Sequence, residues 1–369
     1  MKASQDILLS LVRNALWGTP CELTAKPDWD KVLYLARQQT VTGLVAEAVP
    51  GLPEEFQPDA GQKLKIHSAA MGIYRSHALL NGKLAQVREL MDSADIRSVL
   101  FKGQGVALNY PNPQSRQCGD IDLYVGEKNF LKGMDLLEPG VVHDVDMYKD
   151  MKHFTIDSDG VHVELHRIAE MLPGRKADRE FQKWTVEELM GPDVRSVMIG
   201  GCEVDLPPVD FDTLYIMNHA WHHFINGGIG LRQLCDWTMY LHRFHDRIDV
   251  ARLESNLKRF RLTRAWQVMS CFCVKYLGFP AGECPLHSGR YGREADKMLE
   301  LVFSEGNFGK FSSARKSPRP AGHFAGKFHS FMVTNRRMLK VLPLSPAEVV
   351  RSWVFFFIRG MKNVNKRIK

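Results

Sequence analysis

Residues 99–125 decide the fold of this chain and read VLFKGQGVALNYPNPQSRQCGDIDLYV. The stretch opens with a short β-rich run that ends on glycines, passes through a turn-rich segment and closes on a run of strictly alternating polarity. In this second run Ile121, Leu123 and Val125 share one face, and the carboxylates Asp120 and Asp122 share the other. The pattern predicts a strand that is buried on one side and carries two neighbouring carboxylates on its other side.

The segment after this strand predicts a helix and a hairpin. Residues 127–137 have helical spacing, and the alternating runs 153–157 and 161–166 flank Ser158-Asp-Gly160. Asp-Gly between two alternating runs is a strong hairpin signal. In the second run the apolar positions face one way, whereas Glu164 and two histidines face the other. Glu164 is therefore the third carboxylate that we expect on the polar face of this sheet.

Three carboxylates on one face of a sheet predict a divalent metal site. Two aspartates at positions i and i+2 of a strand repel each other unless one is protonated or a cation lies between them. Mg²⁺ prefers such oxygen ligands, and two metal ions can clamp the attacking and leaving oxygens of a phosphoryl displacement. We expect Asp120, Asp122 and Glu164 to hold Mg²⁺ or Mn²⁺. The alternatives are a solvated strand end and, for Glu164, an ordinary surface position.

Phosphate contacts are expected upstream of the carboxylates. Lys102-Gly103-Gln104-Gly105 leaves a β-run and enters a short helix, and backbone amides at such a junction can hold phosphate. Lys102 adds a point charge there. Arg116, four residues before Asp120, is expected to pair with phosphate or to orient a carboxylate.

The remaining sequence predicts helices on both sides of this core. A chain of 369 residues exceeds the roughly 250–300 residues at which single cores stop growing. We predict an N-terminal helical region (1–92), a core with the sheet (93–206) and a C-terminal helical region with a basic tail (207–369). Within the last region we expect helices over 208–225, 231–245 and 253–278, a loop over 306–330 and a final helix from Ser345.

These motifs resemble a bacterial family of uncharacterised nucleotidyltransferases within the polymerase-β-like superfamily. Its members typically read LKG…YP…R…DIDLLV, followed by a strand pair that ends in a VELH-like segment, here His162-Val-Glu-Leu-His166. Residues 218–237, NHAWHHFINGGIGLRQLCDW, are similar to the family's helical region. The resemblance extends from about Arg75 to Tyr240 and is strongest over 99–125.

The resemblance implies an α+β fold in which a small mixed sheet of polymerase-β-like topology is flanked by N-terminal and C-terminal helical regions. It implies transfer of a nucleoside monophosphate from a nucleoside triphosphate to an acceptor hydroxyl. Asp120, Asp122 and Glu164 match the metal triad, and Glu164 is alternatively the base. Lys102 and Gly103 take the place of the phosphate turn. The widespread pattern has serine where this chain has Gln104, so the serine contact to phosphate is missing.

Other polar residues have less specific signals. His219, His222 and His223 lie on one expected helix, and histidines at i and i+4 can bind zinc. Because no HExxH motif is present, we favour helix packing or a lining of the acceptor pocket. Arg232 and Asp236 have the spacing of a helix ion pair.

Charge is concentrated at the C-terminal end. Of the net charge of +7, residues 306–369 contribute +13, with 14 lysines and arginines against Glu348 alone. Such a segment supplies sequence-independent affinity for phosphates, so a nucleic acid is a candidate partner for residues 306–369. A solvated basic surface is the alternative. For residues 349–358, packing of the final helix is favoured over a position on a membrane surface.

The cysteines and the hydropathy indicate a cytoplasmic protein. Seven scattered cysteines without a CxxC pair argue against a disulfide framework and a zinc ribbon. We find no signal-peptide pattern and no transmembrane segment, which would need about 18 uninterrupted apolar residues. Besides a metal-dependent nucleotidyltransferase acting on an unknown acceptor, two functions stay open. One is a catalytically weak binding module of the toxin–antitoxin type, and the other is a nucleic-acid-binding protein.

Overall fold

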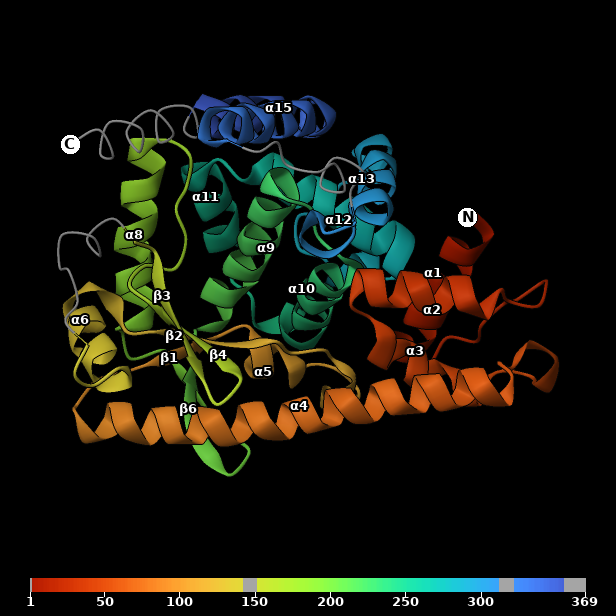
Figure 1. Ribbon diagram of the computed structural model, residues 1–369. Coiled ribbons are helices and arrows are strands. Elements are labelled where there is room, and N and C mark those ends of the chain that lie inside the picture. Colours follow the sequence, from red (N-terminus) through yellow and green to blue (C-terminus); the bar gives the residue numbers. More distant parts are fainter. Residues whose placement is uncertain (1, 142–150, 312–321, 355–369) are drawn as a thin grey trace.

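A single mixed sheet carries the strands of the predicted site. The computed structural model describes residues 2–141, 151–311 and 322–354, and in these ranges six strands have the order β3-β4-β2-β1-β6-β5 (Figure 1). The pairs β2–β4 and β1–β6 are parallel, and the other pairs are antiparallel. The strands are β1 (Val99–Phe101), β2 (Asp120–Tyr124), β3 (His153–Ser158), β4 (Val161–His166), β5 (Arg195–Ile199) and β6 (Cys202–Leu206). The expected α+β architecture is confirmed.

The alternation of β2 and β4 sorts their side chains onto two faces of the sheet. Ile121, Leu123 and Leu165 are fully buried in one core, under α4 (Ala60–Ser93) and α6 (Gly126–Leu137). The opposite face carries the carboxylates. It packs under α9 (Val209–Asn226), as contacts between the rings of Phe101 and Tyr215 and of Phe101 and Phe211 show.

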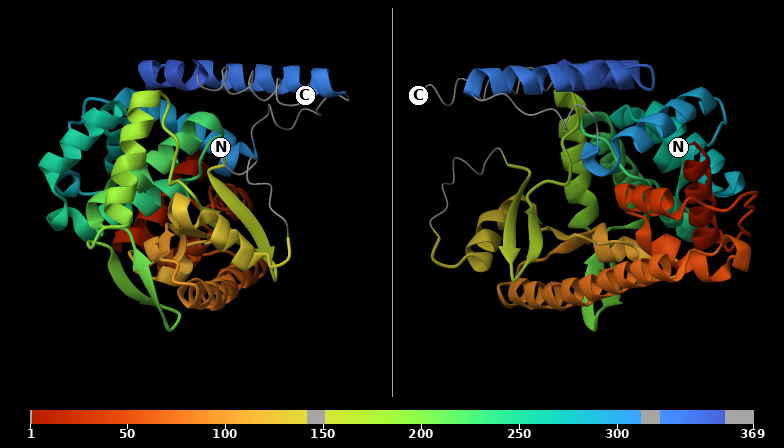
Figure 2. Two further views of the ribbon diagram at one scale, coloured as in Figure 1. Left: turned by 90° about the vertical axis from the view of Figure 1, so that its left-hand side faces the viewer. Right: turned by 45° about the vertical axis from the view of Figure 1, so that its right-hand side comes forward.

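Helices enclose the sheet from both sides. The long helix α4 begins with a capping box at Asp59 and runs along one side of the molecule (Figures 1 and 2). Before it come α1 (Lys2–Trp17), α2 (Trp29–Gln39) and α3 (Thr42–Ala48). Between the first two strands lies the short helix α5 (Gly103–Ala107). The later helices are α8 (Arg175–Leu189), α9, α10 (Leu231–Phe244), α11 (Val250–Phe260), α12 (Thr263–Leu277), α13 (Gly292–Glu305) and α15 (His323–Val341).

The structure differs from the sequence expectations in three places. The helix expected over 253–278 is two helices, because Arg261 adopts a left-handed conformation (φ 62°) and ends α11. The loop expected over 306–330 is wrong from His323 onward, where α15 begins, and residues 312–321 lie outside the described residues. The hairpin β5–β6, which turns at two glycines with positive φ, was not predicted.

The final helix is confirmed where the structure describes it, over residues 346–354, and Ser345 donates a hydrogen bond to Glu348 (3.2 Å). Before it, α15 lies across the helical side of the molecule (Figure 2). Its Arg337 binds Glu305 and two carbonyl groups of α9, so part of the basic segment is attached to the body of the protein. Among the described helices, none is long and apolar enough to cross a membrane.

Candidate active site

The sheet brings the three predicted carboxylates onto one face. Asp120 and Asp122 are two residues apart on β2, so their side chains project to the same side. The parallel strand β4 places Glu164 directly opposite Asp122. Neighbouring strands lie about 4.8 Å apart, so the three carboxyl groups share one small region of the sheet.

Asp122 is the buried member of the group and has basic partners at one of its oxygens. Its Oδ1 accepts hydrogen bonds from Lys102 Nζ (3.3 Å) and His166 Nε2 (2.9 Å), and the residue is 3% exposed. Burial alone would raise the pKa of Asp122, but the charge of Lys102 and the contact with His166 outweigh it and hold this pKa well below its usual range. Asp122 is therefore a carboxylate at neutral pH.

The pKa of Asp120 is shifted in the opposite direction to that of Asp122. Within the described residues, no hydrogen bond or ion pair engages its carboxyl group. Burial, together with the charge of Asp122, raises the pKa of Asp120. A half-buried carboxyl group without a partner beside a second carboxylate is a position that a divalent cation would stabilise. The donor set of Asp120 and Asp122 thus fits a divalent metal such as Mg²⁺.

Glu164 lies beside two imidazoles. Its Oε2 is 3.4 Å from His166 Nε2 and 3.5 Å from His153 Nδ1. Burial is the largest influence and opposes ionisation, but the imidazoles of His166 and His153 together outweigh it, so the pKa of Glu164 is lowered. The ligand atoms of His153, Glu164 and His166 all lie within 4.8 Å of one another.

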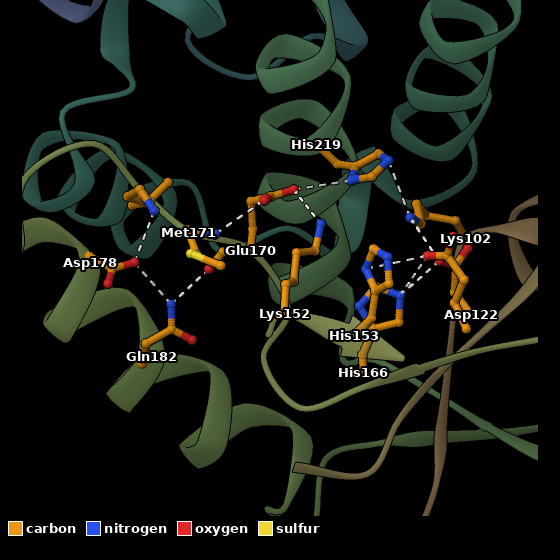
Figure 3. A network of polar contacts seen from close by, with 12 residues as sticks. Lys102, Asp122, Lys152, His153, His166, Glu170, Met171, Asp178, Gln182 and His219 are labelled. Atoms are coloured by element: carbon orange, nitrogen blue, oxygen red, sulfur yellow. Dashed lines mark hydrogen bonds and ion pairs between the residues drawn. The ribbon is translucent and has the colours of Figure 1, made fainter. Parts of the chain in front are cut away.

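Lys102 connects the carboxylates to a buried polar chain on α9 (Figure 3). Its Nζ donates to Nε2 of His219 (3.2 Å), and Nδ1 of His219 lies 3.3 Å from Glu170. Lys152 also binds Glu170, at 3.0 Å. Burial, and then the charge of Lys102, lowers the pKa of His219 far below its usual value, so its ring is neutral and carries its proton on Nδ1.

The backbone at Lys102 is held in an unusual conformation. Lys102 has φ 47° and ψ −133°, and Gly103 follows with φ 45°. Non-glycine residues with positive φ are uncommon, and such conformations cluster at functional sites. The conformation turns the chain from β1 into α5 and places the ammonium group of Lys102 beside Asp122.

A small cleft opens over this face of the sheet. Its volume is about 50 Å³, which is room for only a few water molecules. A nucleotide bound here would extend beyond it. The cleft lies between β2, α5, α9 and α10, and the lining side chains that bear on function are Lys102, Asp120, Asp122, His219, Arg232 and Phe308.

Arg116 is committed to a carboxylate. Its Nε and Nη2 donate to Oδ1 and Oδ2 of Asp236 at 2.9 and 2.7 Å, and Tyr110 donates to the same carboxylate at 2.7 Å. Arg116 therefore contacts a carboxylate of α10, and its two expected roles stay predictions. In the part of the chain that the structure describes, the ion pair expected between Arg232 and Asp236 does not form. Asp236 pairs with Arg116 instead, and Arg232 donates a hydrogen bond to the carbonyl oxygen of Gln117.

Gln104 lies apart from the carboxylates. Its side chain is 2% exposed, and it lines a separate hollow with His77, Asn81 and Gln114. Of the turn residues, Lys102 and Gly103 line the cleft. The expected phosphate contact of residue 104 could therefore come only from its backbone amide.

Comparison with known proteins places the chain in a family. Residues 25–278 match the family described as "Uncharacterised nucleotidyltransferase". The chain belongs to this family. A crystal structure of an antigenic nucleotidyltransferase-like protein from Paracoccidioides brasiliensis is similar at 14% identity, with a TM-score of 0.27, over 52% of this chain and 91% of that chain. No curated protein matches.

The family match covers a longer part of the chain than the motif stretch that suggested it. It includes α2, α3 and α4 before the sheet and the helices from α9 to α12, whereas α1 lies outside it. Sequence reasoning did not assign roles to His153, Lys152 or Glu170. The alternation of β4 had placed His166 beside Glu164, but the partners of His153 and Glu170 depend on contacts between distant segments.

Proposed function

We propose that this chain is a divalent-metal-dependent nucleotidyltransferase. It would transfer a nucleoside monophosphate from a nucleoside triphosphate to an acceptor hydroxyl and release pyrophosphate. The observation that carries the proposal is the row of Asp120, Asp122 and Glu164 on one face of the sheet, in a chain that belongs to a nucleotidyltransferase family. We also propose that the chain is a member of the polymerase-β-like superfamily.

Asp120 and Asp122 would hold the metal, with Glu164 as the third carboxylate. When bound, the ion would neutralise the charge that develops on the phosphate oxygens. Such a site needs ionised ligands, and Asp122 and Glu164 both have lowered pKa values.

The residues around the metal would bind the phosphates and accept the proton. The acceptor oxygen forms a bond to the α-phosphorus while the bond to the bridging oxygen of pyrophosphate breaks. The acceptor proton passes to the Glu164 carboxylate. Lys102 and the backbone at Gly103 and Gln104 would contact the phosphates. Arg116 stays a weaker candidate, because its guanidinium group is paired with Asp236.

Binding is the first test. Calorimetry with each of the four ribonucleoside triphosphates in Mg²⁺ should show binding of at least one. Chelation of the metal, or Asp120→Asn, should weaken it at least tenfold. Glu203→Gln, an exposed carboxylate on β6, is the matched control and should bind as wild type. Absence of binding for all four nucleotides would contradict the proposal.

Transfer is the second test. The protein is incubated with α-labelled and, separately, γ-labelled triphosphate and a panel of acceptors: a sugar alcohol, a serine-rich protein and an RNA with a free 3′ end. We expect label from the α-phosphate alone to reach an acceptor. Binding without transfer or pyrophosphate release would favour the second candidate, a catalytically weak binding module. That candidate is supported by the position of Lys102, whose ammonium is held by Asp122 and His219.

The proposal that residues 306–369 bind nucleic acid must be tested with variants that keep the fold intact. Removing the segment would break the attachment of Arg337 and the buried contacts of Met338 and Val341. Arg336 and Lys340 are exposed on α15, so Arg336→Glu with Lys340→Glu changes charge alone. Salt-dependent RNA binding that survives this double substitution would count against α15 as the contact surface.

A further inference from the structure

A second group of metal-binding atoms lies on the strands next to the aspartates. His153 on β3 is the antiparallel partner of His166 on β4, and Glu164 is two residues before His166. Residues paired across antiparallel strands, and residues two apart on one strand, project from the same face of the sheet. The topology alone therefore places two imidazoles and one carboxylate together.

The distances in this cluster fit metal ligands better than hydrogen bonds. Glu164 Oε2 is 3.4 Å from His166 Nε2 and 3.5 Å from His153 Nδ1. A strong hydrogen bond between charged partners would be about 2.7–2.9 Å. Ligand atoms about 2.0–2.1 Å from a tetrahedral Zn²⁺ are separated by about 3.3–3.4 Å. The two observed separations are close to this second value.

The cluster also has an unsatisfied ligand atom and lies close to the surface of the protein. Nδ1 of His153 is buried and has no hydrogen-bond partner within the described residues. Other atoms of His153 and Glu164 reach solvent, because their side chains are 34% and 24% exposed. His166 Nε2 now donates to Asp122 (2.9 Å), and metal binding would move this proton to Nδ1.

We propose that His153, Glu164 and His166 form a transition-metal site beside the Mg²⁺ site expected at Asp120 and Asp122, with Glu164 common to both. Imidazole nitrogens suit Zn²⁺ and similar ions such as Co²⁺, whereas Mg²⁺ and Mn²⁺ prefer oxygen ligands. Two histidines and one carboxylate are a common ligand set of zinc sites that leave a coordination position open.

The proposal concerns metal binding alone and does not depend on nucleotide transfer. If both proposals hold, Glu164 is the ligand that both sites compete for. The cluster would then give the candidate active site a higher affinity for transition metals than carboxylates alone provide. This last step rests on the proposed function.

Cobalt is a suitable probe, because tetrahedral Co²⁺ absorbs visible light much more strongly than octahedral Co²⁺. The full-length protein is freed of metal with a chelator and titrated with Co²⁺. We expect an intense visible band that saturates at one equivalent, is lost on addition of equimolar Zn²⁺ and persists in excess Mg²⁺. His153→Gln should weaken Co²⁺ binding at least tenfold.

His162→Gln is the matched control, because His162 lies on β4 with Glu164 and His166, is exposed and pairs with Asp157 instead. It should bind Co²⁺ as wild type does. Asp120→Asn should also leave the band unchanged, so failure of the metal cluster and failure of the nucleotidyltransferase proposal are distinguishable. X-ray absorption of the zinc-loaded wild-type protein should show two imidazole ligands. A missing band, imidazole-free absorption data, or a folded His153→Gln variant that binds like wild type would overturn the proposal.

Discussion

Asp120 and Asp122 are two residues apart on the same strand, yet their surroundings oppose each other. Asp122 is ionised and held by Lys102 and His166, whereas Asp120 has no partner among the described residues and a raised pKa. Asp122 therefore stabilises the fold without a metal. Asp120 would be stabilised by a bound cation. This difference can be measured separately from activity.

In metal-free buffer, Asp122→Asn should lower the free energy of unfolding by about 3 kcal/mol, because it leaves the largely enclosed ammonium group of Lys102 without its counter-charge. Asp120→Asn should leave this free energy unchanged or raise it, because it removes repulsion. Urea unfolding with a chelator present measures both variants. Equal losses for the two variants would show that Asp120 has a structural partner after all.

The sequence predicts that the three carboxylates share one face of the sheet, but it does not predict which side chains from distant segments surround them. Period-two alternation alone predicted that Asp120, Asp122 and Glu164 share a face, which the strand register bears out. No local pattern indicates that Arg116 binds Asp236, which is 120 residues away. The assigned roles of these residues stay predictions, because geometry does not test chemistry.

At the scale of elements, close backbone contacts fix the loop that leads to β2. A Cβ atom added to Gly43 on α3 would lie 2.0 Å from the carbonyl oxygen of Ser115, in the turn before Arg116. A backbone atom cannot move aside as a flexible side chain can. Gly72 on α4 has no atom within 4 Å of such a Cβ.

We expect Gly43→Ala to lower the free energy of unfolding by about 1–3 kcal/mol or more, through overpacking against backbone. Gly72→Ala, in the middle of α4, should raise it by roughly 0.5–1 kcal/mol, because alanine loses less conformational entropy in a helix. Thermal and urea unfolding of both variants check this pair. If both stabilise the protein, α3 and the turn at Ser115 are not in close contact.

Elements with a local signal were predicted well. The alternation of β2 and the Asp-Gly turn between β3 and β4 are both present, with Asp159 and Gly160 at positive φ. The hairpin β5–β6 was missed because it lies between helices and exposes part of its apolar surface, including Met198. The break at Arg261 was missed because left-handed arginine has no clear sequence signal.

At the scale of the whole molecule, the buried pair of Arg116 and Asp236 joins the loop before β2 to α10. Both side chains are less than a tenth exposed, so the pair is shielded from solvent. It therefore holds the sheet against the helical region. Whether the regions 1–92, 93–206 and 207–369 fold separately stays a prediction, and this pair argues for coupling between the last two.

Arg116→Met should lower the free energy of unfolding by about 3–5 kcal/mol, because it leaves Asp236 buried without its partner. The double substitution Arg116→Met with Asp236→Leu should recover a large part of this loss. Arg259→Met, which removes an exposed ion pair with Glu180, is the control and should change stability far less. A double variant as unstable as the sum of the single variants would exclude direct coupling.

Glu348 makes the stability of the whole molecule depend on pH. It is buried, and burial raises its pKa to about 7. A carboxyl group with a folded-state pKa above its unfolded value of about 4.3 binds more protons in the folded state. Its contribution is therefore complete below about pH 4 and is lost as the pH rises towards 7. With about 1.4 kcal/mol for each pKa unit, the loss is at most about 3–4 kcal/mol.

Glu348→Gln should remove this loss, so the stability of the variant relative to wild type should increase from pH 5 to about pH 7 and level off above it. Urea unfolding at several pH values measures the difference. Glu300→Gln, on the exposed face of α13, provides the control and should give a difference that is flat with pH. A flat difference for Glu348→Gln as well would mean that Glu348 is ionised in the folded protein at pH 5. In that case water or a basic group reaches its carboxylate, and the helix over residues 346–354 would be packed less tightly than the buried position of Val349 implies.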